Sequence, residues 1–192
     1  MQVATSPKRQ DARAVRSRAA MQGALIKLLR DFPLAEVTGA MVSETAGIGY
    51  STFFRHYADV RALLVDAVGE LANDLAQKML PALLDGQAGP AALALIQEID
   101  RRRAEVTALM AGAGEAMRVE LAGSIVDRLA ALPDISPDWL PQHLALRVAV
   151  AATIELCDWW LLEQPATPIA VVADMLDRLV VAPMTAHGTG TI

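Results

Sequence analysis

Apolar residues recur at helical spacing along nearly the whole chain, and proline or glycine interrupts each run. The first run lies on one helical face and contains Met21, Leu25, Leu28 and Phe32. Pro33 ends it, because the residue before a proline is pushed out of the helical region. The sequence is 54% hydrophobic but only 4% aromatic, which favours helices over strands. We therefore predict an all-α chain of about nine helices. The expected ranges are 12–31, 39–45, 50–56, 60–81, 91–102, 103–111, 114–131, 141–163 and 168–181.

Charge is unevenly distributed along the chain, whose net charge is -5. Residues 1–64 hold nine of the 17 basic and five of the 22 acidic residues, so their charge is +4 and that of residues 65–192 is -9. An even negative surface would argue against a nucleic-acid partner, but this asymmetry indicates a basic head facing a polyanion on an acidic body. Judged by charge alone, the alternative explanation of the asymmetry is that solvated charges are distributed by chance.

The chain contains one cysteine, Cys157, which excludes an intrachain disulfide and a cysteine-cluster zinc site. His143 lies 14 residues earlier in the same expected helix, about 21 Å along its axis, so an activated Cys-His pair is not expected. We expect no enzyme activity, no metal and no cofactor. Apolar stretches are too short for a membrane span or a signal sequence, so we expect a cytoplasmic protein without a membrane partner.

Two short helices joined by a tight turn are expected within residues 37–57. Thr38 is a good N-cap for the first helix, and Val37 can pack on Val42 as a hydrophobic staple. The glycines of residues 46–49 can supply the positive φ or close approach that a sharp turn needs. In such helix-turn-helix units the second helix enters the DNA major groove. The residues expected to face the core of this unit are Ile48, Phe53 and Tyr57.

The stretch from Val37 to Leu64 resembles the helix 2 to 4 signature of the TetR family of transcriptional regulators, without any gap. The matching residues are Val37-Thr38, Val42, Ala46-Gly47-Ile48, Ser51-Thr52-Phe53-Phe54-Arg55-His56-Tyr57, Asp59 and Leu63-Leu64. In the first helix Ala24 and Leu28-Leu29 also match. The rest of the chain matches only in the order of its helices. The resemblance implies an N-terminal three-helix helix-turn-helix head and a C-terminal helical bundle.

The resemblance also implies a function. It implies a homodimeric, sequence-specific regulator of transcription, a repressor, that binds a double-stranded DNA operator and responds to a small-molecule effector. Two alternatives remain open: a DNA-binding protein of the same fold without a small-molecule effector, and a helical interaction module that has lost DNA binding. The expected division is a flexible basic arm (1–11), a DNA-binding domain (12–64), an effector-binding and dimerisation domain (65–182) and a flexible tail (183–192). We call residues 12–64 the head and residues 65–182 the body.

The DNA-contacting residues are expected mainly on the second helix of the unit. Its first turn, residues 50–52, can reach base edges, whereas Arg55 and His56 at its end match positions that contact phosphates in the family. The amides at the start of the first helix, with Thr38, form an anion site. The full expected set is Thr38, Gly49, Tyr50, Ser51, Thr52, Phe54, Arg55, His56 and Arg61.

Four residues depart from the family pattern. Gly39 replaces a branched apolar residue, which should loosen the start of its helix by roughly 1 kcal/mol. Gly49 replaces a Ser or Thr N-cap. Phe54 replaces a phosphate-binding tyrosine and Val60 replaces a lysine. Phosphate binding would then rest on the N-terminal arginines, Arg55 and Arg61.

The body carries the expected effector and dimer sites. Candidates for lining an adaptable apolar pocket are Met79, Met110, Met117 and Trp159. The run Arg101-Arg102-Arg103 is either an anion-binding site or solvated charge. The last two long helices are expected to form the dimer interface, as in the family's four-helix bundle. Its residues would be Val148, Ala152, Leu156 and Trp159 on the first helix and Ile169, Val172, Leu176 and Leu179 on the second.

Overall fold

The computed structural model describes residues 7–185 and is all-α over that range, as predicted. Nine continuous helices are present there when the wide π-helical turns η2 and η3 are joined to their neighbours. The expected arm and tail fall partly outside the described residues, at positions 1–6 and 186–192.

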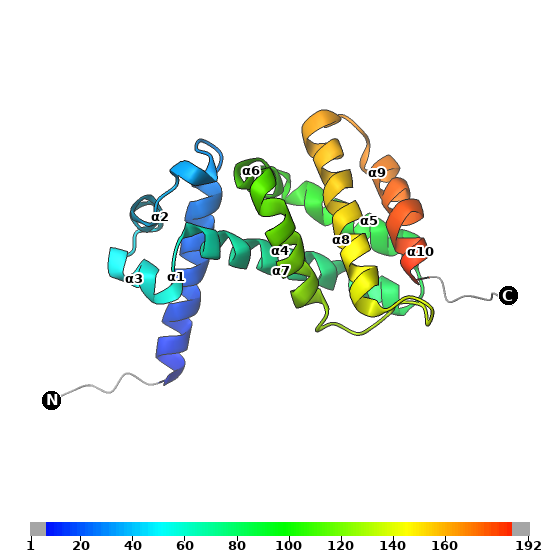
Figure 1. The fold of residues 1–192 in the computed structure, drawn as a ribbon, viewed down its shortest axis with the longest axis horizontal. Helices are drawn as coiled ribbons and strands as arrows, with labels where there is room; N and C mark the ends of the chain where they lie inside the picture. The colour runs from blue at the N-terminus through cyan, green and yellow to red at the C-terminus, as the bar shows by residue number, and fades with distance from the viewer. Residues whose placement is uncertain (1–6, 186–192) are drawn as a thin grey trace, which may run out of the picture.

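The head lies at one end of the molecule (Figure 1). It contains α1 (Pro7–Leu28), the short turn η1 (Leu34–Glu36), α2 (Gly39–Ala46) and α3 (Tyr50–His56). The long helix α4 (Val60–Leu84) begins against the head and continues into the body. Its start is capped by Asp59, whose carboxylate accepts a hydrogen bond from the Ala62 N–H (2.8 Å).

The body packs five further continuous helices around the outer part of α4. These are α5 (Ala88–Arg101), α6 (Arg103–Ala113), α7 (Glu115–Leu129), α8 (Gln142–Asp158) with η2 (Trp159–Glu163), and α9 (Ile169–Leu176) with η3 (Asp177–Val181) and α10 (Ala182–Thr185). α4 contacts α5 and α7, and α9 lies against α5. Of the body helices, α6 contacts α1 of the head.

Prolines account for most errors in the predicted helix boundaries. α1 begins at Pro7, so residues 7–11 are helical and not part of an arm. α5 begins at Ala88 and holds Pro90 in its first turn. Both positions tolerate proline, because the first N–H groups of a helix have no partner within it. α4 continues through Pro81 for one more turn, and Pro183 lies in α10, which follows the wide turn η3. The chain is therefore helical to Thr185 and not a tail from residue 183.

Two of the predicted breaks are displaced. The helix expected to begin at residue 91 begins at Ala88, and the break before it lies at Gly86, where φ is 70°, a left-handed value that favours glycine. A positive φ also marks the end of α6 at Gly114, where φ is 71°, whereas Gly112 lies within that helix.

Candidate nucleic-acid interface and body cavity

The predicted helix-turn-helix is present in the head. Thr38 Oγ1 accepts a hydrogen bond from the Met41 N–H (3.2 Å) and so caps α2. Gly47 has φ 66° and ends α2 in the left-handed conformation. Gly49 has φ -68° and makes no side-chain cap, so only one of the two glycines supplies a positive φ. Val37 and Val42, the expected staple, are both buried.

Phe53 is the centre of the head core. Its ring is fully buried, and Tyr57 is buried beside it, as predicted, whereas Ile48 is half-buried. A Cβ at Gly39 would lie 3.0 Å from Phe53 Cε1. Gly39 therefore leaves room for this ring, and the prediction that it only loosens α2 is incomplete.

α3 presents a continuous outer surface. Tyr50, Ser51, Phe54 and Arg55 are exposed, and Thr52 and His56 are half-buried. The rings of Tyr50 and Phe54 meet edge to face with centroids 4.9 Å apart. Arg55 Nη2 donates to Thr52 Oγ1 (2.9 Å), which holds its guanidinium along the helix. This surface offers two aromatic rings, hydroxyl groups and one cation side by side.

Arg61 does not stand free beside that surface. Its Nε donates to Glu120 Oε2 of α7 at 2.7 Å, and the guanidinium forms an ion pair with the same carboxylate. The ion pair links the head to the body and compensates the charge of Arg61, whose role as a DNA contact stays a prediction. Glu120 is distant in sequence, so no local pattern could have shown this.

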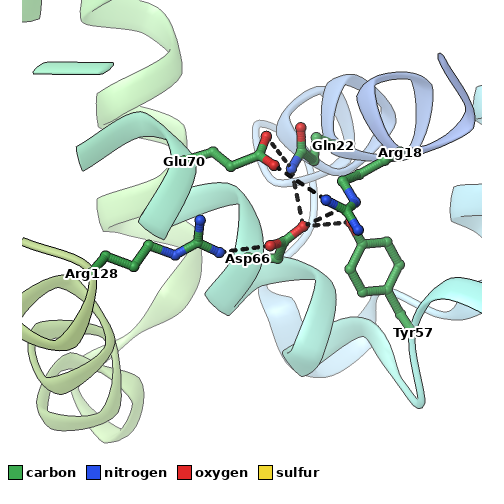
Figure 2. A network of polar contacts seen from close by, with 6 residues as sticks. All are labelled: Arg18, Gln22, Tyr57, Asp66, Glu70 and Arg128. Atoms are coloured by element: carbon green, nitrogen blue, oxygen red, sulfur yellow. Dashed lines mark hydrogen bonds and ion pairs between the residues drawn. The ribbon is translucent and has the colours of Figure 1, made fainter. Parts of the chain in front are cut away.

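A second polar link between head and body is centred on Asp66 of α4 (Figure 2). The Tyr57 hydroxyl donates to Asp66 Oδ2 (2.6 Å), and Arg128 Nη2 of α7 donates to Oδ1 (2.7 Å). Arg18 and Gln22 of α1 approach the same carboxylate, at 3.7 Å and 3.3 Å. The network therefore joins α1, the end of α3, α4 and α7.

Ionisation of this network follows from its contacts. Burial alone would raise the pKa of Asp66, but hydrogen bonds from Tyr57 and Arg128 and the charge of Arg18 outweigh it, and the pKa is lowered. Burial, followed by the hydrogen bond to Asp66, raises the pKa of Tyr57. Asp66 is thus a carboxylate and Tyr57 a neutral donor at neutral pH.

Glycines allow close packing between helices near these polar links. A Cβ at Gly69 of α4 would clash with Arg128 Nε, and one at Gly112 of α6 would lie 2.8 Å from Leu29 Cδ2. α6 and α7 are therefore the two body helices that pack directly on the head and on the start of α4.

The body contains an apolar cavity of about 310 Å³. Met79 and Met110 line it, as predicted, together with Met184, which the sequence analysis had assigned to the tail. Met117 and Trp159 are not among its lining residues, and these two predictions are wrong: Met117 is buried elsewhere in the core, and Trp159 packs against that core from the turn after α8. The volume falls within the range of ligand pockets.

One ion pair lies in the wall of the cavity. Arg118 of α7 pairs with Asp158 Oδ2 at the end of α8, and their side chains are 32% and 13% exposed. Asp158 Oδ1 is buried and has no hydrogen-bond partner among the described residues. Cys157 also lines the cavity, and burial raises the pKa of its thiol to about 12.

The arginine run 101–103 is engaged in local ion pairs. Arg101 pairs with Glu98, Arg102 with Glu98 and Asp74, and Arg103 with Asp100. Arg103 also lies over the Trp160 ring, 4.4 Å from its centroid. The three arginines are therefore neutralised by neighbouring carboxylates, which argues against an anion-binding site at this run.

The predicted dimer residues separate into three groups by exposure. Val172 and Leu176 have no exposed surface, because this face of α9 lies against the body, and they are wrong as interface residues. Ala152, Leu156, Trp159 and Ile169 are half-buried against the core. Val148 and Leu179 are exposed. Three other large apolar residues of the same continuous helices are exposed and were not predicted: Leu144, Leu162 and Val171.

No helix within residues 7–185 combines the length and apolarity needed to cross a membrane. In the described part of the chain, no three or more His, Cys, Asp or Glu residues gather in a way that could hold a metal ion.

Comparison with family models and curated proteins finds no match. Solved structures do match over most of their length. FadR of Thermus thermophilus, a TetR-family repressor in complex with lauroyl-CoA, is 17% identical with a TM-score of 0.55, over 91% of this chain and 98% of that one. A TetR regulator of Streptococcus agalactiae is 17% identical with a TM-score of 0.61, over 92% and 99%. FadR of Bacillus subtilis in complex with stearoyl-CoA is 11% identical with a TM-score of 0.60, over 86% and 98%.

Proposed function

The chain has the fold of TetR-family regulators, and we propose that it is a sequence-specific DNA-binding regulator of transcription. In this proposal it acts as a homodimeric repressor in the cytoplasm. The observation that carries this proposal is the outer surface of α3. Tyr50 and Ser51 lie exposed in its first turn, on a helix that Phe53 anchors in the core of the head. A helix presented in this way can enter a major groove with its first turn toward the base edges.

Electrostatics supports the same proposal. The charge of residues 1–64 is +4, and Arg13 and Arg16 are exposed on α1. Because Arg61 is paired with Glu120, phosphate binding rests on Arg55, on His56 and on these α1 arginines. Affinity should therefore fall steeply as salt rises, since binding releases counterions from DNA.

The test separates base contacts from phosphate contacts on α3. Tyr50→Ala and Ser51→Ala should weaken binding to an operator selected from genomic fragments by about 1 to 3 kcal/mol and leave binding to scrambled duplex nearly unchanged. Arg55→Ala should weaken binding to both and reduce the salt slope by about one. The measurement is a paired fluorescence titration at several salt concentrations.

Controls define the outcomes. Phe53→Ala should abolish both kinds of binding, because it removes about 3 to 5 kcal/mol of core packing. A chain that enriches no sequence at low salt is a helical interaction module instead. Equal losses on operator and scrambled duplex for Tyr50→Ala would remove base reading from α3 and leave DNA binding in place.

The cavity favours a small-molecule effector over a regulator without one. Two similar structures are named as complexes with lauroyl-CoA and stearoyl-CoA. Here Arg118, the one basic residue among the described lining residues, is already paired with Asp158, so the phosphates of a CoA group would find no suitable cation in the lining. We propose an apolar effector without a polyanionic group.

α7 is the proposed route from the cavity to DNA. It carries Arg118 in the cavity wall, and Glu120 and Arg128, which hold Arg61 and Asp66 of α4. Arg118 and Arg128 are about 15 Å apart along the helix axis. An effector that prefers one position of α7 would shift the spacing of the two heads. Arg128→Ala should therefore reduce the change in DNA affinity that an effector causes, measured as the ratio of DNA affinities with and without it.

A further inference from the structure

The charged groups in the cavity wall limit what the cavity can bind. They are Arg118, Asp134 and Asp158, among otherwise mostly apolar side chains. Asp134 lies on the loop after α7, where its carboxylate accepts hydrogen bonds from the N–H and hydroxyl of Ser136. Both hydrogen bonds fall on Oδ1, and the residue is exposed, so water can solvate this carboxylate without a ligand. The charged group that distinguishes the wall is the pair of Arg118 and Asp158.

Asp158 is only partly satisfied by that pair. Oδ2 contacts Arg118, whereas Oδ1 is buried and has no hydrogen-bond partner among the described residues. A buried carboxylate oxygen without a donor is energetically unfavourable, and such atoms in folded proteins are usually satisfied by a donor. Asp158 lines the cavity, and a ligand that brings an N–H or O–H group to its carboxylate, with a turn of the side chain that opens Oδ1 to the cavity, removes this penalty. A ligand that brings a carboxylate places a second negative charge beside it.

We propose that the cavity binds an apolar molecule bearing a single hydrogen-bond-donating group, best a protonated amine, which Asp158 accepts. The proposal rests on the effector-binding role given above and adds its chemical class. The apolar wall buries the hydrocarbon part, and the one polar contact sets its orientation. Because Arg118 lies on α7, a ligand that competes for Asp158 acts on the helix that contacts the head.

Three probes with the same hydrocarbon chain test the class. Decylamine, decanol and decanoate are titrated against the full chain at neutral pH by calorimetry, with thermal unfolding as a second measurement. We expect decylamine to bind at least about tenfold more tightly than decanoate, which corresponds to about 1.4 kcal/mol, with decanol in between. Decanoate binding as tightly as decylamine, or none of the probes binding, overturns the proposal.

Substitution of Asp158 should reverse the order. Asp158→Asn removes the negative charge that attracts an amine and repels a carboxylate, whereas the positive charge of Arg118 stays, so decanoate should bind more tightly than decylamine. Asp127→Asn, on the exposed surface of α7 and outside the cavity lining, is the matched control and should keep the original order. Asp134→Asn should keep it as well. Loss of the amine preference in Asp134→Asn but not in Asp158→Asn contradicts the assignment.

Arg118→Gln is the second variant if Asp158→Asn does not fold. It leaves the Asp158 charge without its cation, so decylamine should bind more tightly than to the unchanged chain, and an unchanged affinity overturns the proposal. None of these measurements uses DNA. A chain that binds no DNA but shows the expected probe order refutes only the proposed regulator, and the wrong probe order in a DNA-binding chain refutes only this inference.

Discussion

The contact of α6 with the end of α1 allows a quantitative test of how the body meets the head. Gly112 is buried in α6, and a Cβ at this position would lie 2.8 Å from Leu29 Cδ2 and 2.9 Å from Leu29 Cβ. Leu29 is itself only 5% exposed. Its Cβ is attached to the backbone, so rotation of the side chain cannot relieve both contacts. Gly112→Ala must therefore push α6 away from Leu29.

The size of the effect comes from two opposing terms. Alanine in place of glycine in a helix stabilises by up to about 1 kcal/mol. Overpacking a buried contact destabilises by about 1 to 3 kcal/mol. Gly112→Ala should then lower the free energy of unfolding by about 1 kcal/mol. Gly123→Ala is the matched control, because Gly123 is exposed on α7 and no atom lies within 4 Å of its would-be Cβ. It should raise the free energy of unfolding by about 0.5 to 1 kcal/mol.

Urea unfolding followed by circular dichroism measures both variants against the unchanged chain. The two substitutions are chemically identical, so the difference between them isolates the contact with Leu29. The expected difference is about 2 kcal/mol. If Gly112→Ala is as stable as Gly123→Ala, α6 does not approach Leu29 closely, and the proposed packing of body on head is refuted.

Further predictions concern the polar link, the thiol and the dimer. Tyr57→Phe should lower the free energy of unfolding by about 1 to 2 kcal/mol, measured in urea, because Asp66 loses a donor. The pKa of Asp66 is lower in the folded chain than its unfolded value of about 4, so its contribution to stability is complete above that pH and is lost as pH falls through the folded pKa. In Asp66→Asn the free energy of unfolding should therefore depend less on pH in the acid range. Cys157, whose thiol pKa is about 12, should react with iodoacetamide at neutral pH only after unfolding. Leu179→Asp should give folded monomers on sedimentation, whereas Leu176→Asp should unfold the chain; a stable Leu179→Asp dimer places the interface elsewhere.

Local chemistry made the head predictable from sequence. The Thr38 cap, the left-handed Gly47 and the buried Phe53 each depend on residues within a few positions of one another. Capping and turn preferences act over that range, and helical periodicity shows which face is apolar. The all-α class and the resemblance of residues 37–64 came from the same signals.

Helical periodicity could not predict which face of a helix points inward when the helix is apolar on more than one side. α9 has apolar residues nearly all round, and contact with α5 places Val172 and Leu176 inward and Val171 and Leu179 outward. Sequence spacing alone favoured the stripe through Val172 and Leu176. Which apolar residues remain for a partner was decided by packing against another helix.

Contacts between residues distant in sequence determined the rest. Asp66 meets Arg128 across 62 positions, and Arg61 meets Glu120 across 59. Neither pairing leaves a local pattern, since each needs α7 to lie beside α4. The sequence by itself therefore determined the helices and the surface of α3, through interactions within one or two turns. The tertiary structure decided which charges are compensated, where the cavity lies and how the body contacts the head, because these depend on distances between separate helices.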